Sequence, residues 1–229
     1  MRGATLVLVL AVSTAAVAAT ELLSGIDSAQ SLSSFQQSYY REPRPELVPD
    51  AIRFVGASDL LEQEGAPRVT AAFFAELFAR HRGRVAEWSA VMHAQPEPAR
   101  VMLRRAVASA GAPRALIDAE PPSPARNDMC WAAFFASGDS WYVDHLIEQL
   151  DYDAERSDLR LFVTGSSAKW SLASNAGVHP VVEQRLEAAR DVASGTRRTA
   201  LDQVLTASPG QIRAEAIEIV RKGRESGKW

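Results

Sequence analysis

Apolar positions recur along this chain with the spacing of an α-helix rather than that of a β-strand. From Pro45 onward most segments place hydrophobic residues three and four positions apart, and none sustains the apolar–polar alternation of a half-buried strand. The clearest run contains Val143, Leu146, Ile147 and Leu150, which follow the i, i+3, i+4, i+7 rule. The pattern predicts an all-α protein of stacked antiparallel helix pairs, either α-solenoid-like or an irregular helical array.

Glycine and proline mark where the predicted helices start and stop. Three helices are expected over residues 69–82, 85–92 and 97–110. Gly83 separates the first two, and Gly111 ends the third because glycine tolerates the left-handed conformation common just after a helix. Ser208 and Pro209 form a start signal for a last helix, which we expect to cap the stack.

Residues 131–150 and 170–189 align without a gap at an offset of 39 residues. The identical pairs are Trp131 with Trp170, Gly138 with Gly177, Val143 with Val182 and Glu148 with Glu187. Each stretch is predicted to form a helix, a tight turn and a second helix. Because a helix pair that cannot bury its apolar face alone must stack on a neighbour, this repeat favours a surface that binds over one that catalyses.

The sequences Trp-Ala-Ala-Phe-Phe-Ala-Ser-Gly, at residues 131–138, and the stretch at 169–179 resemble exported bacterial proteins of helical-repeat type. In general character these are similar to HEAT and tetratricopeptide arrays. The resemblance covers residues 45–189 and implies an all-helical fold, but it implies no activity and no catalytic residue. The signature patterns of tetratricopeptide and ankyrin units do not occur in the chain.

The first 19 residues form a distinct unit of the sequence. Arg2 is the only charge, residues 4–19 are rich in Leu, Val and Ala, and an A-x-A pattern ends at Ala18. This favours a cleaved signal peptide over residues 1–19, because a membrane span needs about 20 apolar residues. The protein is therefore expected to be periplasmic or secreted. The alternative is an uncleaved anchor, in which residues 4–19 hold the protein at the membrane.

Two further boundaries follow from composition. Residues 20–44 are rich in Ser and Gln and end in two prolines, so they are interpreted as a flexible tether. Residues 45–229 form the predicted α-helical domain. Its densest helix-breaking segment, residues 120–124, is the point at which that domain would be divided in two.

Composition is that of an ordinary globular protein. Of the 229 residues, 47% are hydrophobic and 23% are charged, which excludes the low-hydrophobicity class of disordered chains. The formal net charge is −3, so nothing points to nucleic acid as a partner. Cys130 is the only cysteine, which excludes an intramolecular disulfide, and its apolar neighbours predict a buried thiol.

Candidate chemistry is sparse. Ser166 and Lys169 fit the S-x-x-K pattern of penicillin-recognising enzymes, but the other signatures of that class are absent, so we expect Ser166 or Ser167 to cap a helix and Lys169 to be solvated. Asp151 and Asp153 are likewise expected in a solvated loop. The four histidines lack the spacing of a zinc site. The sequence therefore predicts no catalytic residue, no metal site and no cofactor.

The best binding candidates lie at the turn of the first repeat unit. Asp139 is expected to cap the second helix, and Trp141 follows it where repeat proteins often expose contacts. The sequence thus predicts a binding or scaffold module, without enzymatic activity, for a protein or peptide partner in the cell envelope or outside the cell. Membrane contact is expected only if the leader stays uncleaved. The rival hypothesis is a cell-envelope hydrolase that uses Ser166 and Lys169 or an unrecognised acid.

Overall fold

The computed structural model describes residues 25–229, and within that range every regular element is helical, which confirms the all-α class. The α-helices are α1 (Ala29–Ser38), α2 (Val48–Ala57), α3 (Ala66–Arg80), α4 (Val85–His93), α5 (Glu97–Ser109), α6 (Arg114–Asp118), α7 (Pro124–Ser137), α8 (Trp141–Glu148), α9 (Leu159–Ala176), α10 (Pro180–Val192), α11 (Gly195–Thr206) and α12 (Pro209–Glu225). Short 3-10 helices are η1 (Pro45–Leu47), η2 (Asp59–Glu62), η3 (Arg82–Arg84) and η4 (Gln149–Ala154). The leader predicted at residues 1–19 lies outside the described residues.

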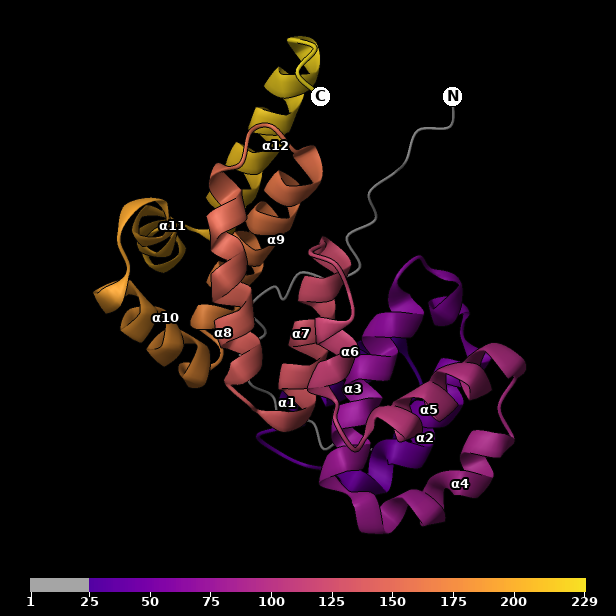
Figure 1. The fold of residues 1–229 in the computed structure, drawn as a ribbon. Helices are drawn as coiled ribbons and strands as arrows, with labels where there is room; N and C mark the ends of the chain where they lie inside the picture. Colours follow the sequence, from indigo (N-terminus) through magenta and orange to yellow (C-terminus); the bar gives the residue numbers. More distant parts are fainter. Residues whose placement is uncertain (1–24) are drawn as a thin grey trace.

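Helices α3 and α7 lie side by side at the centre of the fold (Figure 1). Helix α5 packs on α3, with α2 and α4 against α5, and α8 and α9 pack on α7. Helix α12 runs along α9 at the far end (Figure 1). Among the helices of this part of the chain, none has both the length and the apolar character needed to cross a membrane.

Aromatic side chains of the two central helices are buried in the core. Phe73, Phe74 and Phe78 of α3 and Trp131 and Phe134 of α7 are each at most 1% exposed. The rings of Phe73 and Phe74 lie 5.6 Å apart and nearly perpendicular, an edge-to-face arrangement that aromatic pairs favour. The spacing by four of Phe74 and Phe78 is what places both on one face of α3.

Residues 20–44 are predicted to form a flexible tether, but within the described part of that segment, residues 25–44, the prediction is wrong, because residues 29–38 form helix α1. Ser28 and Ser31 make a reciprocal capping box at its start. Leu32, Phe35 and Tyr39 follow helical spacing and are at most 4% exposed, with the ring of Phe35 packed 6.0 Å from that of Phe73 across the core. Helical spacing therefore decides the structure of this segment more than its Ser and Gln content does.

Residues 120–124 do not separate two cores. Ser123 caps α7 by accepting the backbone N–H of Arg126, and α7 then packs along α3. Glu120 lies within ion-pair distance of Arg68 of α3 and Arg105 of α5. A single cluster of buried residues runs from Ile26 to Val204, so the helices before and after this segment share one core.

The 39-residue repeat holds only for the two helix boundaries that flank each turn, because the outer ends of the helices are offset by other intervals and the turns themselves differ. Helices α7 and α9 end at Ser137 and Ala176, and α8 and α10 begin at Trp141 and Pro180, each 39 residues apart. The turn glycines differ, because Gly138 has a φ of +72° and Gly177 a φ of −75°. A side chain at position 138 would meet the ring of Tyr40, with Cδ2 only 2.7 Å from the new Cβ. The tryptophans also differ: Trp131 is buried, whereas Trp170 is partly exposed beneath Arg213.

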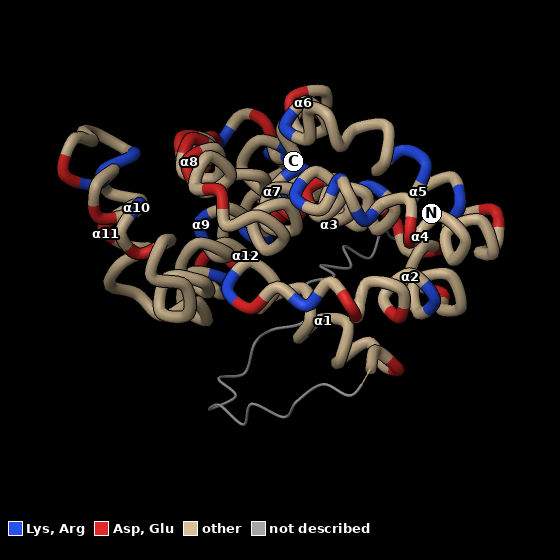
Figure 2. Tube along the Cα trace, turned by 90° about the horizontal axis from the view of Figure 1, so that it is seen from below, with Lys and Arg blue, Asp and Glu red and all other residues tan. Residues whose placement is uncertain are grey.

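Basic and acidic positions are interspersed over the surface (Figure 2). Several of them join neighbouring helices. Arg185 of α10 donates to both carboxylate oxygens of Asp144 of α8, at 2.6 and 2.8 Å. Arg197 of α11 pairs in the same way with Asp151 of η4. Bidentate geometry makes these pairs more directional than isolated surface ion pairs.

Candidate ligand groove

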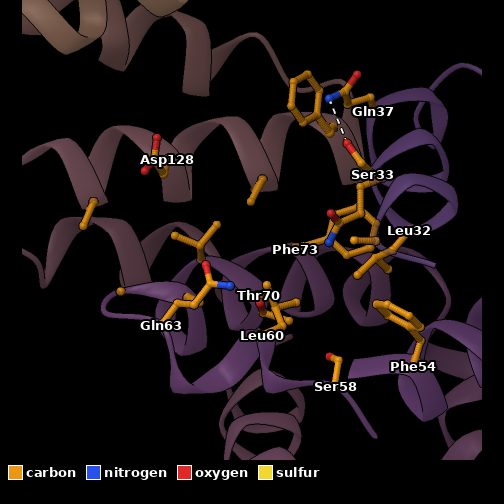
Figure 3. Close-up of a pocket in the computed structure, with 18 of the residues that line it drawn as sticks. Leu32, Ser33, Gln37, Phe54, Ser58, Leu60, Gln63, Thr70, Phe73 and Asp128 are labelled. Carbon is orange, nitrogen blue, oxygen red and sulfur yellow. Dashed lines mark hydrogen bonds between the residues drawn. The ribbon is translucent and has the colours of Figure 1, made fainter. Parts of the chain in front are cut away.

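A groove of about 290 Å³ opens between α1, the end of α2, η2, the start of α3 and α7 (Figure 3). Its apolar lining residues are Leu32, Phe54, Leu60, Val69, Phe73 and Phe135, together with the alanines at positions 29, 66, 125 and 132. Leu32, Phe73 and Phe135 are buried, whereas Phe54, Leu60 and Val69 are only partly buried. The groove therefore has a buried apolar floor and apolar walls that can still lose water on contact with a ligand.

The wall formed by η2 depends on how the chain passes from α2 to α3. Ser58 is extended after the last turn of α2, and η2 contains only four residues. Gly65 then adopts a φ of +84°, the left-handed region that suits glycine, and Pro67 lies in the first turn of α3. This sharp entry into α3 places Leu60 and Gln63 beside Thr70 along the groove (Figure 3).

Uncharged polar groups also line the groove. They are Ser33, Gln36 and Gln37 of α1, together with Ser58, Gln63 and Thr70. The Gln37 amide donates a hydrogen bond of 3.2 Å to the Ser33 hydroxyl (Figure 3). Hydroxyl and amide groups of this kind can both donate and accept, which suits the backbone of an extended peptide.

The charged groups of the groove are all acidic. Asp59, Glu64 and Asp128 are among its 20 lining residues, and none of the 20 is Lys or Arg. Asp128, on α7, makes no hydrogen bond or ion pair with any residue of the described range 25–229. Burial raises the pKa of its carboxyl to about 7, and no neighbouring charge contributes to that shift. A carboxyl with a raised pKa that lines a groove is a candidate functional group.

Replacement of Asp128 by Asn should stabilise the protein at pH 8 by about 2 kcal/mol. The pKa rise from 3.8 to about 7 means that the folded state holds the proton more tightly than the unfolded state. The stabilisation that comes from this tighter proton binding is fully present below pH 3.8 and is lost as the pH rises through about 7. A shift of this size corresponds to at most about 4 kcal/mol, which we halve because Asp128 is partly exposed. Urea unfolding at pH 4 and pH 8 measures the effect, and equal gains at both pH values would contradict it.

The predicted binding residues Asp139 and Trp141 lie together, but away from the groove. Asp139 accepts the Trp141 backbone N–H at 3.0 Å and pairs through its other oxygen with Arg114. The Arg114 guanidinium lies 5.0 Å from the centre of the Trp141 ring, and that ring stacks on His145. Both residues are partly exposed. Their groups are therefore already engaged by neighbours, which fixes the turn between α7 and α8.

The expectations for Ser166, Lys169 and Asp153 are wrong. Ser166 lies inside α9, which Asp158 caps, and the Lys169 side chain is only 5% exposed. Asp153 accepts the Ser166 hydroxyl at 3.0 Å and pairs with the Lys169 ammonium at 2.8 Å. The neighbour that allows this approach is Gly165, since a Cβ there would lie 2.2 Å from the Asp153 backbone nitrogen. Sequence spacing alone does not reveal a partner that comes from another element.

In this geometry Lys169 is not free to act as the base of an S-x-x-K serine nucleophile. Catalysis of that type requires a lysine able to take the proton from the serine hydroxyl. Here the Ser166 hydroxyl donates to a carboxylate, and Lys169 is held as an ion pair by the same group. The three side chains form a closed structural cluster between η4 and α9.

Sequence reasoning also missed Glu76. The Tyr142 hydroxyl of α8 donates to its carboxylate, and burial raises the pKa of Glu76 above its usual value. Glu76 is the only charge between Thr70 and Leu77, and Asp128 directly precedes the buried run from Met129 to Ala136. A lone acid within or beside an apolar run is the signal that could have found both residues.

The side chain of Cys130 is 1% exposed, as predicted, and burial raises the pKa of its thiol to about 12, so the reactive thiolate is disfavoured. Within residues 25–229, no group of three or more His, Cys, Asp or Glu side chains is arranged to hold a metal ion.

The described residues form an all-α protein with a candidate ligand groove between α1, α2, η2, α3 and α7. Comparisons with protein-family models, with curated proteins and with solved structures found no match to this chain. The resemblance to exported helical-repeat proteins therefore stays a prediction.

Proposed function

We propose that this protein is a helical binding module that accepts a short apolar segment of a protein or peptide partner in the groove between α1, η2, α3 and α7. The observation that carries the proposal is the combination of partly buried Phe54, Leu60 and Val69 with polar groups along the edge. A volume of about 290 Å³ suits one or two residues of a ligand rather than a folded domain.

The chemistry of the side chains favours binding over hydrolysis. The serine and lysine of the S-x-x-K pattern are engaged by Asp153, so the serine route of the rival hypothesis lacks a free base. The groove offers apolar contact and hydrogen bonding, which are the usual means of holding a peptide.

The place of action follows from the leader pattern at residues 1–19. We propose that the module works in the periplasm or outside the cell, with its partner in the cell envelope or beyond it. If the leader is retained, the same module works at the membrane surface. Mass spectrometry of the exported product distinguishes the two cases, because an intact Met1 refutes cleavage.

Selection from a displayed library of random dodecapeptides at pH 8 tests the groove directly. Peptides enriched on the full chain should lose about 10-fold to 100-fold in affinity when Phe54 or Leu60 is replaced by Ala. This corresponds to the loss of about 1.5–3 kcal/mol of apolar contact. Fluorescence polarisation with the resynthesised peptides gives the dissociation constants.

A matched control is available on α12. Ile217 is 59% exposed and lies outside the groove, so Ile217→Ala should leave peptide affinity unchanged within about twofold. Enriched peptides that bind the Phe54→Ala and Leu60→Ala variants as tightly as the original protein would refute the groove as the site. Circular dichroism of each variant confirms that the helices are intact.

A further inference from the structure

The acids of the groove are left without basic partners by the surrounding chain. Arg53, next to Phe54, pairs with Asp50 at 2.7 Å, and Arg68, next to Val69, pairs with Glu120 at 2.8 Å. On α7, Arg126 donates to the backbone oxygen of Ile117. The basic residues nearest in sequence to the groove walls therefore point to partners elsewhere.

Asp59, Glu64 and Asp128 consequently have no ion pair within the part of the chain that the structure describes. Asp59 and Glu64 are exposed to water, which screens them, whereas Asp128 is the more buried of the three. An ionised carboxylate that is removed from water without a partner is costly. A cation supplied by a ligand would offset that cost.

From this arrangement we infer that the groove recognises a peptide segment that carries a lysine or arginine beside an apolar residue, with the apolar side chain on Phe54 and Leu60 and the basic group against Asp128. This inference rests on the proposed function of the groove. It adds the sign of the charge that the partner must bring. An acidic segment is disfavoured, because it would place like charges together in a poorly solvated space.

A pH dependence follows from the groups that face the groove. Helix α7 contributes Asp128, η2 contributes Asp59, and Glu64 lies in the turn before α3. The lining residues of α1, α2 and α3 are uncharged, and none of the lining residues is histidine. With the pKa of Asp128 at about 7, about one tenth of the molecules carry an ionised Asp128 at pH 6, and most of them do at pH 8. A basic peptide binds the ionised form. Its affinity should therefore fall about tenfold from pH 8 to pH 6.

The test uses the groove-dependent peptides from the library selection. Each is resynthesised with its lysine or arginine replaced by norleucine, which keeps an unbranched aliphatic chain and removes the charged group. We expect the replacement to weaken binding at least about tenfold at pH 8 in the original protein, and less than about twofold in the Asp128→Asn variant. The variant should also lose the difference between pH 6 and pH 8.

Asp118→Asn serves as the matched control. Asp118 is an exposed acid at the end of α6 and does not line the groove, so this variant should keep both the charge preference and the pH dependence. Thermal unfolding followed by circular dichroism confirms that both Asn variants fold.

The outcomes separate the inference from the proposed function. Peptides that need Phe54 and Leu60 but lack basic residues, or tolerate norleucine, would overturn the charge inference and leave the binding function standing. Retention of the charge preference in Asp128→Asn would also overturn it. If no enriched peptide depends on Phe54 or Leu60, both the inference and the proposed function fall.

Discussion

Replacement of Gly165 by Ala should lower the free energy of unfolding by about 3–5 kcal/mol. The atoms nearest to the added methyl group belong to backbone, with the Asp153 nitrogen at 2.2 Å and the Tyr152 carbonyl carbon at 2.5 Å. Backbone in a packed turn cannot rotate away as the end of a flexible side chain can. Helix α9 and η4 must therefore move apart, which also pulls Asp153 from Ser166 and Lys169.

Urea unfolding followed by circular dichroism measures this loss, with Gly177→Ala as the control. Gly177 ends α9 with a φ of −75°, and a methyl group added there would meet open space, so alanine fits without strain. We expect this control to change stability by less than about 1 kcal/mol. If Gly165→Ala is tolerated equally well, the close approach of η4 to α9 is wrong.

Replacement of Lys169 by Met should cost about 3 kcal/mol. Methionine fills a similar volume, but it leaves Asp153 without its ion pair in a region where that side chain is only 19% exposed. Loss of one partner of a buried pair costs about 3–5 kcal/mol, because the remaining charge is no longer compensated. We take the lower end, since Ser166 still donates a hydrogen bond to the carboxylate.

A double variant separates the cost of the unpaired charge from the loss of packing. Asp153→Asn combined with Lys169→Met should be more stable than Lys169→Met alone, because the unpaired charge is gone. Lys222→Met is the matched control, since Lys222 is 69% exposed and its contact with Glu218 spans 3.4 Å. That variant should change stability by less than about 0.5 kcal/mol. A free energy that does not improve in the double variant would show that Lys169 acts through packing alone.

Periodicity predicted the helical fold well, because the fold buries the same stripes that the sequence displays. Val143, Leu146, Ile147 and Leu150 are all buried, as their spacing predicts. Amino-acid composition predicts the secondary structure of this chain less well than periodicity does. Ser and Gln around α1 suggested a tether, although Phe35 and Tyr39 already carried the spacing of a buried face. A short apolar stripe in a polar segment decides the fold when it meets a partner such as Phe73.

The groove could not be predicted from sequence, because its walls come from separate parts of the chain. Leu32, Phe54, Leu60 and Asp128 line one groove because α1 packs on α7 and α7 packs on α3. The raised pKa of Asp128 could not be predicted for the same reason, since burial and the absence of a partner are properties of the packed molecule. The turn at Asp139 and Trp141 was found from local signals, and its engagement by Arg114 was not, because Arg114 lies 25 residues away in sequence.

Helix α1 has a practical consequence for anyone preparing shortened forms of this protein. The helix supplies both a wall of the groove and part of the cover over Phe73, and its cap begins at Ser28. Purification tags should therefore be joined upstream of Ile26, which is itself buried. Deletion of the chain through Phe35 would expose aromatic surface and promote aggregation. Loss of binding by such a shortened protein would therefore give no information about its partner.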